Sequence, residues 1–362
     1  MPNISDKLDF FLFADDTNIY YESRDLKELE KTVNDELKKL SLWLNLNRLA
    51  LNVGKTNFVI FRSYQKIPNH QVTLLMNKKA IQQKDHVKYL GVLLDQHLNW
   101  KYQVKNVSLK ISRGIGIMAK LKPFLKDKLL RSIYYSLVYS HLSYGIHVWG
   151  SADQTTLNKL SILQNKAVRI MSGKQYFQVY GQEPGPLPSS EPLYKNLLIL
   201  KLVDIFKLNI ASFVFSTLVE ESPANFHDWF SYDHDIHEHS TRAGAVVTRE
   251  GYFDVGIATV SFLLHTKGSN NQHGEKMIQK SGPIIWNDIP DHIQGAPSIQ
   301  AFKTNLKKHF FSQYDVINSD NNEYRRIYNT NNHNNNHSNN SNSNNTSGNI
   351  TFKRPWVSRW DT

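Results

Sequence analysis

The hydrophobic positions of the first hundred residues predict a β-hairpin followed by one amphipathic helix. Two short apolar runs, Phe10–Phe13 and Ile19–Tyr21, flank a polar stretch, which is typical of a hairpin. Leucine and valine then recur at spacings of three and four from residue 26 to residue 44, the spacing of one helix face. Asp25 precedes this stripe and Glu28 follows three residues later, as in a capping box. The helix is therefore predicted to begin at Asp25.

Further strand-like runs follow this helix, at Asn57–Phe61, Val72–Met76 and Val87–Leu94. Short strands on both sides of a helix are typical of an α+β fold. We therefore expect residues 1–97 to form one α+β region.

Helical spacing dominates the rest of the chain. Residues 98–173 have helical periodicity, Gly181 to Pro192 is rich in glycine and proline, and Tyr194–Leu218 is again helix-like. Residues 224–314 have a mixed pattern that predicts no single element. These changes predict a helical region at 98–175 and a mixed C-terminal region at 176–315.

The last part of the chain has almost nothing to bury. Residues 329–349 consist mainly of asparagine, histidine and serine. Such a tract cannot form a packed core, and it is typical of disordered, low-complexity sequence. Residues 316–362 are therefore predicted to be a disordered tail.

Charge and cysteine content restrict the class of protein. The 362 residues include 43 Lys plus Arg and 32 Asp plus Glu, a formal net charge of +11, which suits a polyanionic partner. The chain has no cysteine, so disulfides, cysteine-based zinc fingers and thiol catalysis are excluded. The N-terminus lacks the pattern of a signal peptide, and no apolar run is long enough to span a membrane. We expect an intracellular protein of the nucleus or cytoplasm that does not bind membranes.

The positive charge is concentrated at the start of the predicted helical region. Between residues 101 and 131 the only acid is Asp127. A solvated helix face or a surface that neutralises nucleic-acid phosphates would both explain this imbalance. The nine basic residues are Lys101, Lys105, Lys110, Arg113, Lys120, Lys122, Lys126, Lys128 and Arg131.

Two adjacent acids, Asp15 and Asp16, lie at the turn of the predicted hairpin. Adjacent carboxylates repel each other, and a divalent cation such as Mg²⁺, which binds carboxylates together with substrate phosphates, would neutralise them. A solvated turn is the alternative. The neighbouring residues decide between the two interpretations.

Residues 13–17 read Phe-Ala-Asp-Asp-Thr and resemble the acidic hairpin of reverse transcriptases from non-LTR, jockey-type retrotransposons. The resemblance continues in order from residue 8 to residue 312. It includes Leu42-Trp43-Leu44, Leu49-Ala50-Leu51-Asn52, Lys55-Thr56, Tyr89-Leu90-Gly91-Val92, Leu94-Asp95, Leu98-Asn99-Trp100, Tyr144-Gly145, Trp149-Gly150, the run from Leu163 to Arg169, Gly282-Pro283, Trp286-Asn287 and Ile289-Pro290.

This resemblance implies roles for individual residues. Asp15 and Asp16 would be the second pair of catalytic Mg²⁺ ligands, and Lys55 would lie near the incoming nucleotide. Tyr89 and Gly91 would lie where the family holds the primer end. The simpler alternatives are a solvent-facing turn for Lys55 and an interior strand for Tyr89 and Gly91. The basic residues Lys101, Lys105, Lys110, Arg113, Lys120 and Lys122 would contact nucleic acid.

The resemblance also implies a fold and partners. Residues 1–97 would be part of a polymerase palm, made of antiparallel strands with a helix, and 98–175 a helical, thumb-like region. RNA template, DNA primer and deoxynucleotides would be the partners, and the sequence does not determine the oligomeric state.

One departure from the family pattern limits the expected activity. The family needs a further aspartate and nucleotide-binding fingers upstream, whereas the chain starts fourteen residues before Asp15. Asp6 and Asp9 are too near the hairpin to replace that aspartate. We therefore expect a polymerase fragment that is inactive alone. The alternatives are a non-catalytic nucleic-acid-binding remnant and an unrelated protein with a purely structural turn.

Three histidines, His234, His237 and His239, form a second candidate metal cluster. Their spacing matches no standard zinc site, because a distant second pair of ligands is missing. We interpret this segment as a loop.

Limited proteolysis tests the predicted tail. We expect protease to remove residue 316 onward and to leave a resistant core, because ordering a backbone costs about 1–2 kcal/mol per residue and this tract buries too little to offset it. Mass spectrometry of the digest locates the boundary. A tail that resists digestion as long as the core does would contradict the prediction.

Overall fold

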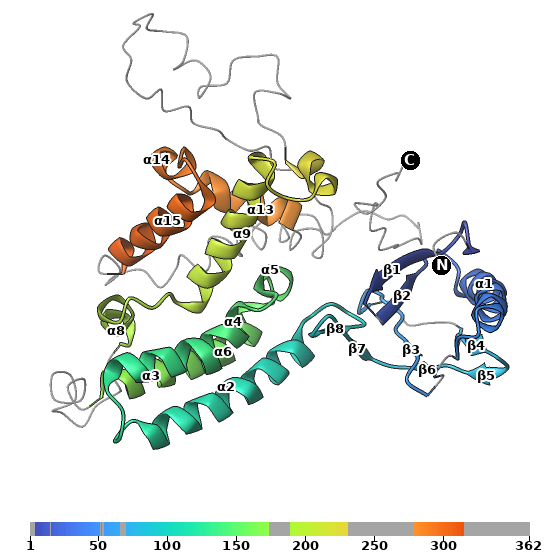
Figure 1. Ribbon diagram of the computed structural model, residues 1–362, viewed down its shortest axis with the longest axis horizontal. Coiled ribbons are helices and arrows are strands. Elements are labelled where there is room, and N and C mark those ends of the chain that lie inside the picture. The colour runs from blue at the N-terminus through green and yellow to red at the C-terminus, as the bar shows by residue number, and fades with distance from the viewer. Residues whose placement is uncertain are drawn as a thin grey trace, which may run out of the picture. The chain divides into compact units, whose positions relative to one another are not determined.

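The computed structural model describes residues 4–14, 16–50, 52, 54–65, 70–173, 189–230 and 278–314. They divide into two compact units, one ending at Tyr102 and the other beginning at Gln103 (Figure 1). Most of the predicted Gly- and Pro-rich linker, the loop of His234, His237 and His239, and the predicted tail lie outside the described residues. None of the described helices is long and apolar enough to cross a membrane.

The first unit begins with the predicted hairpin and helix. Strands β1 (Asp9–Phe13) and β2 (Asp16–Tyr20) pair antiparallel, and helix α1 spans Leu26–Leu46. The Asp25 side chain caps α1 by accepting a hydrogen bond from the Lys27 backbone N–H, as predicted. The expected capping box does not form, because Glu28 instead accepts a hydrogen bond from the Ser23 hydroxyl.

The core of the first unit lies between α1 and the segment that follows it. The leucine and valine stripe of α1 packs on this segment, and Phe10 and Ile19 of the hairpin pack against the same cluster. The buried residues of the core are Leu8, Val33, Leu37, Leu40, Leu44, Val72, Leu74, Met76 and Ile81.

The predicted strand Val72–Met76 is reduced to two residues, β4 (Leu75–Met76), which pairs antiparallel with β5 (Lys79–Ala80). The reason is that side chains of α1 bind its backbone. Asn34 donates to the Thr73 carbonyl and accepts from the Leu75 N–H, while Glu30 accepts from the Thr73 N–H. These bonds replace the ladder that a longer strand would need.

The predicted strand Asn57–Phe61 is also short. Only β3 (Asn57–Phe58) is extended and paired, and it is parallel to β6 (Gln82–Gln83). The remaining pairs of the unit are antiparallel. The mixture of helices and small sheets agrees with the α+β class predicted.

The run Val87–Leu94 is a second hairpin and not one strand. Strands β7 (His86–Tyr89) and β8 (Val92–Asp95) pair antiparallel around a turn of two residues, Leu90 and Gly91. Both turn residues have positive φ, 43° and 85°. A two-residue turn of this kind suits the twist of the flanking strands. Because the turn residue Leu90 is itself apolar, the turn does not interrupt the apolar run from Val87 to Leu94, and the sequence therefore predicted one strand.

The second unit is helical. Helix α2 begins at Lys101 in the first unit and continues into the second. The helical elements are α2 (Lys101–Leu121), α3 (Asp127–Tyr134), the π-helix η2 (Tyr135–Tyr139), α4 (Ser140–Ser143), α5 (Ile146–Trp149), α6 (Gln154–Ser172), α8 (Glu191–Asn196), α9 (Leu202–Leu218), the 3₁₀-helix η3 (Ala224–Trp229), α13 (Ile278–Asn287), α14 (Asp291–Gln294) and α15 (Ile299–Gln313).

Helix α9 is the centre of this unit and is buried along most of its length. It contacts α4, α5 and α6 on one side and α13 and α15 on the other (Figure 1). Phe215 of α9 stacks on Phe302 of α15, which in turn stacks on Trp286 of α13. The Tyr314 hydroxyl, just past α15, donates a hydrogen bond of 2.6 Å to Asp204 of α9. Residues distant in sequence thus form one core.

The expected single helix Tyr194–Leu218 is interrupted between α8 and α9. The interruption follows from hydrogen bonds to its backbone. The carbonyl of Leu198 accepts from the Arg131 side chain, and Gln164 of α6 bonds to the Leu200 carbonyl and the Leu202 N–H. These groups are unavailable to a continuous helix, so the chain turns before α9 begins.

Two glycines of α2 offer a matched test of the helix packing. A Cβ atom at Gly114 would lie 2.9 Å from the Leu137 carbonyl oxygen of η2, whereas one at Gly116 would meet nothing within 4 Å. We expect Gly114→Ala to lower the free energy of unfolding by about 1–3 kcal/mol through steric strain. Gly116→Ala should raise it by about 0.5–1 kcal/mol, because alanine favours the helix. Urea unfolding followed by circular dichroism measures both, and equal effects would contradict this packing.

Candidate functional site

The first candidate site is the turn between β1 and β2. Phe13 pairs with Asp16, so only two positions separate β1 from β2. Asp15 lies outside the described residues. Ala14 has a φ of 52°, as a two-residue turn of this kind requires. The predicted hairpin is confirmed, but its turn is shorter than predicted: β2 already begins at Asp16, which lies next to the turn as the first residue of the strand.

The pairing also determines which way Asp16 faces. Directly opposed residues of an antiparallel pair lie on the same face, and neighbours along a strand alternate. Phe10 and Ile19 are opposed and pack on the core. Asp16 and Phe13 therefore lie on the opposite face, and both are exposed. The core fixes the hairpin while the carboxylate points away from it.

The hairpin fits part of a magnesium site. Mg²⁺ commonly binds one or two carboxylates together with substrate phosphates, and an exposed carboxylate on a fixed turn can supply such a ligand. The described residues contain no group of three histidine, cysteine, aspartate or glutamate side chains that could hold a metal. Asp9 lies on the same face as Asp16 but pairs with Tyr20, four residues along β2, which is roughly 13 Å away at the rise of a strand. Asp9 is thus too distant to complete the site.

Lys55 lies in an exposed turn, which is the simpler of the two interpretations of this residue given by the sequence. Its backbone N–H donates to the carbonyl and to the side chain of Asn52, at 3.0 and 3.2 Å. The Thr56 N–H donates to the same carbonyl. The turn is therefore held by Asn52, and the Lys55 side chain extends into solvent. Among the described residues no ion pair joins Lys55 to Asp16.

Tyr89 and Gly91 lie at the tip of the β7–β8 hairpin. Gly91 occupies the turn and Tyr89 the last position of β7, where it is half-buried. Gly91 is therefore a turn residue and not part of a strand, whereas Tyr89 is a paired strand residue. Leu90 has a φ of 43°, which is uncommon for a bulky residue, and its side chain is 36% exposed.

Sequence analysis missed the organising role of Asp95. This carboxylate is 1% exposed and accepts hydrogen bonds from the backbone N–H groups of His97, Asn99 and Trp100. The three bonds fold the loop that leads from β8 into α2 and support positive φ values at Leu98 and Trp100. An acid at the end of an apolar strand was the available signal. Asp95 positions the start of the basic helix.

The second candidate site is the exposed side of α2. The cations Lys105, Arg113 and Lys120 are exposed, as are Lys101 and Lys110. The opposite side carries the buried residues, and α2 contains no acid. Burial, and then the charge of Lys110, lowers the pKa of His141 in α4. The helix therefore presents positive charge that no acid within it neutralises.

Lys122 differs from the other predicted nucleic-acid-binding cations. Its ammonium donates to Asp127 at 2.7 Å and to the Met171 carbonyl at 3.0 Å. These contacts join the ends of α2, α3 and α6. Five of the six predicted cations thus lie on the exposed side of α2, whereas Lys122 binds other groups of the protein.

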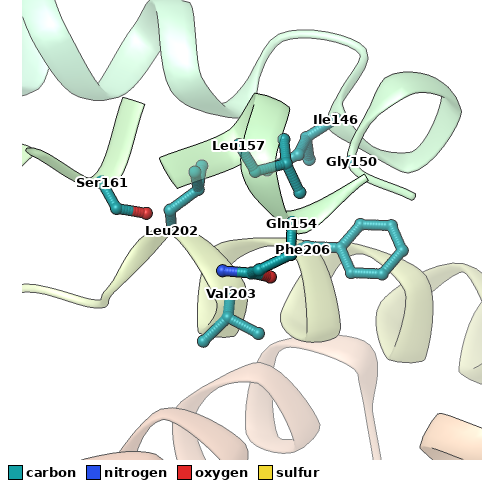
Figure 2. A pocket seen from close by; sticks show the side chains of 8 residues that line it. All are labelled: Ile146, Gly150, Gln154, Leu157, Ser161, Leu202, Val203 and Phe206. Atoms are coloured by element: carbon teal, nitrogen blue, oxygen red, sulfur yellow. The ribbon is translucent and has the colours of Figure 1, made fainter. Parts of the chain in front are cut away.

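A small cavity lies between α5, α6 and α9 (Figure 2). It is lined mainly by apolar side chains, among them Ile146, Leu157, Leu202 and Phe206. Its volume of about 20 Å³ admits about one water molecule. It is too small for a nucleotide, so the candidate chemistry lies at the hairpin and on α2.

Part of the chain is similar to polymerases of mobile elements. It is 26% identical over 170 residues to the probable RNA-directed DNA polymerase from transposon X-element of Drosophila melanogaster. It is 28% identical over 171 residues to the RNA-directed DNA polymerase from mobile element jockey of the same fly. Each match covers 46% of this chain and 18% of the relative.

The chain thus spans less than a fifth of the length of these relatives. No family model matches the chain, and no solved structure matches it. The alternative of an unrelated protein is not supported by these relatives. Over nearly half of its length the chain is homologous to the RNA-directed DNA polymerases of jockey-type, non-LTR elements, which confirms the resemblance drawn from its sequence.

Proposed function

We propose that this chain supplies part of the active site and part of the template–primer surface of an RNA-directed DNA polymerase. The first unit would belong to the palm, and α2 with the helices after it to the thumb. The observation that carries the proposal is the position of Asp16, exposed at a hairpin turn on the face opposite the core. The polymerase relatives support it.

In this proposal Asp15 and Asp16 hold Mg²⁺. When bound, the metal activates the attacking primer hydroxyl and stabilises the charge on the leaving pyrophosphate. The contribution of the chain is positional. Phe10 and Ile19 anchor the hairpin to the core, so Asp16, the first residue of β2, is held at a fixed place. Such positioning matters because an error of about 1 Å can lower a rate on the order of 100-fold.

Lys55 would act on the nucleotide side of the same reaction. Asn52 holds the turn that carries it, and the ammonium is free to approach the phosphates of a bound nucleotide. A cation there stabilises the negative charge that develops on the leaving group. Tyr89 and Gly91, at the tip of β7–β8, would contact the primer end.

RNA template, DNA primer and deoxynucleotides would be the partners of the complete enzyme, in the nucleus or cytoplasm. The alternative function is nucleic-acid binding without catalysis. The exposed cations of α2 favour it, because they need no metal and no third acid.

Primer extension tests the catalytic assignment. We expect no extension by the 362-residue chain alone, because the described residues hold no complete set of metal ligands. Joined to the upstream fingers and palm of a jockey relative, the chain should extend a primer with Mg²⁺, and Asp15→Asn or Asp16→Asn should abolish that activity. Asp9→Asn is the matched control, since Asp9 lies on the same face at the other end of the hairpin.

Two outcomes would contradict this assignment. Extension by the chain alone, lost in Asp16→Asn, would show that the chain holds the complete set of ligands. Activity of the joined protein that survives Asp16→Asn would show that the hairpin is not the metal site.

Salt dependence tests the role of α2. Its five exposed cations, if all bind phosphates, predict a slope of log K against log salt near about −4.5 for an RNA–DNA duplex, at ~0.9 per contact. Lys105→Gln combined with Arg113→Gln should reduce the slope by about 1.8. Filter binding measures both.

The matched control removes the same charge from α1, through Lys27→Gln and Lys38→Gln, both at exposed positions. This pair should leave the slope unchanged. A flat salt response, or equal effects of the two double variants, would contradict duplex binding by α2.

A further inference from the structure

The turn between α2 and α3 displays an aromatic ring to solvent. Phe124 is 83% exposed, more than any other large hydrophobic side chain among the described residues. Single exposed apolar residues are common on protein surfaces and often have no function. The rigidity and the charge of this turn distinguish it from that ordinary case.

The turn is held in place on both sides of Phe124. The backbone N–H groups of Phe124 and Leu125 donate to the Leu121 carbonyl at 3.0 and 3.1 Å. Lys122 joins the turn to Asp127 and to the Met171 carbonyl at the end of α6. On the other side Leu130 is fully buried and fixes the start of α3. The ring is therefore presented by a fixed backbone, which lowers the entropy lost on binding a ligand.

Exposed cations flank Phe124 on both sides in the sequence. Lys120, Lys126 and Lys128 are exposed within four residues of Phe124. The acid of the turn, Asp127, is paired with Lys122. An exposed aromatic ring between cations suits a ligand that carries both flat apolar rings and negative charge, as a single strand of nucleic acid does.

The neighbouring helix favours nucleic acid over a membrane surface as the ligand. Lys101, Lys105, Lys110 and Arg113 extend the positive charge along α2 up to this turn. A strand of phosphates can follow such a row of charges, whereas insertion of one ring into a bilayer would not use them.

We propose that the α2–α3 turn binds an unpaired stretch of nucleic acid, with one base stacked on Phe124 and the flanking phosphates bound by Lys126 and Lys128. This site is distinct from the duplex surface of α2. The inference rests on the proposed function only because the cations of α2 would guide a nucleic-acid strand to the turn.

Binding to single strands and to duplex separates the two surfaces. The full chain is titrated into labelled oligouridylate, oligothymidylate and an RNA–DNA duplex, each of about 15 nucleotides. We expect Phe124→Ala to weaken single-strand binding on the order of 10-fold, since base stacking on an aromatic ring supplies part of the affinity. Phe124→Trp should retain binding, and duplex affinity should be unchanged in both variants.

Leu129→Ala is the matched control, because Leu129 is an exposed apolar residue of the same segment without an aromatic ring. It should leave single-strand affinity unchanged. Photo-crosslinking of oligouridylate carrying 5-bromouridine should label the peptide that contains Phe124.

Three results would overturn this inference. In the first, Phe124→Ala leaves single-strand affinity unchanged. In the second, Phe124→Ala weakens duplex binding as much as single-strand binding. In the third, the chain binds phosphatidylserine vesicles through Phe124 but does not bind single strands. If the wild-type chain binds duplex with the expected salt slope while Phe124→Ala leaves single-strand affinity unchanged, only this inference fails. If it binds neither nucleic acid, the proposed role of α2 fails as well.

Discussion

The second unit depends on one buried amide. Gln164 of α6 is 1% exposed and uses its whole side chain, donating to the Tyr134 hydroxyl and the Leu200 carbonyl and accepting from the Leu202 N–H. Burying an amide without partners costs several kcal/mol, so these three groups must remain in place together. Gln164 thereby fixes α3, α6 and the start of α9 relative to one another. Because α9 is the helix on which α13 and α15 pack, the same amide supports the C-terminal helices.

The segment from Leu163 to Arg169, where the sequence resembles jockey-type reverse transcriptases, has a structural role in this arrangement. Its neighbour Asn165 accepts a hydrogen bond of 2.7 Å from the Tyr194 hydroxyl, which ties α6 to α8. The resemblance at Trp286 has the same physical origin. Its ring is buried and stacks on Phe302, with Phe215 beyond, and its carbonyl accepts from Gln294. Such residues support the core of the second unit, whereas Asp16 and the cations of α2 are exposed.

Local patterns predicted the first hairpin, α1 and the helical character of the second unit, because each depends on spacing within one segment. The sequence failed where a distant side chain intervenes. Asn34 shortens β4 from 41 residues away in sequence, and Gln164 interrupts the helix between α8 and α9 from 38 residues away. The hydrogen bond from Tyr314 to Asp204 joins positions 110 residues apart. For the candidate site, the apolar and polar pattern predicted the hairpin but placed Asp16 in its turn, whereas Asp16 is the first paired residue of β2. The role of Asp95 depends on the backbone N–H groups of the loop after β8, and an acid at the end of an apolar strand does not by itself predict where those groups lie.

The charged residues discussed above fall into two groups, those paired within the fold and those left exposed. Charges that hold the fold have partners within it, as Asp95 has in its own loop and Lys122 has in Asp127 and Met171. Asp16 and the exposed cations of α2 have no such partner among the described residues, although an exposed ion pair would alter stability by only about 0–1 kcal/mol. Leaving them unpaired therefore costs the fold little, and it spares a ligand the cost of breaking an internal pair. An acid on an open hairpin face and a row of cations without acids are complementary to a metal ion and to phosphates, the two charged components of a nucleotide-transfer reaction.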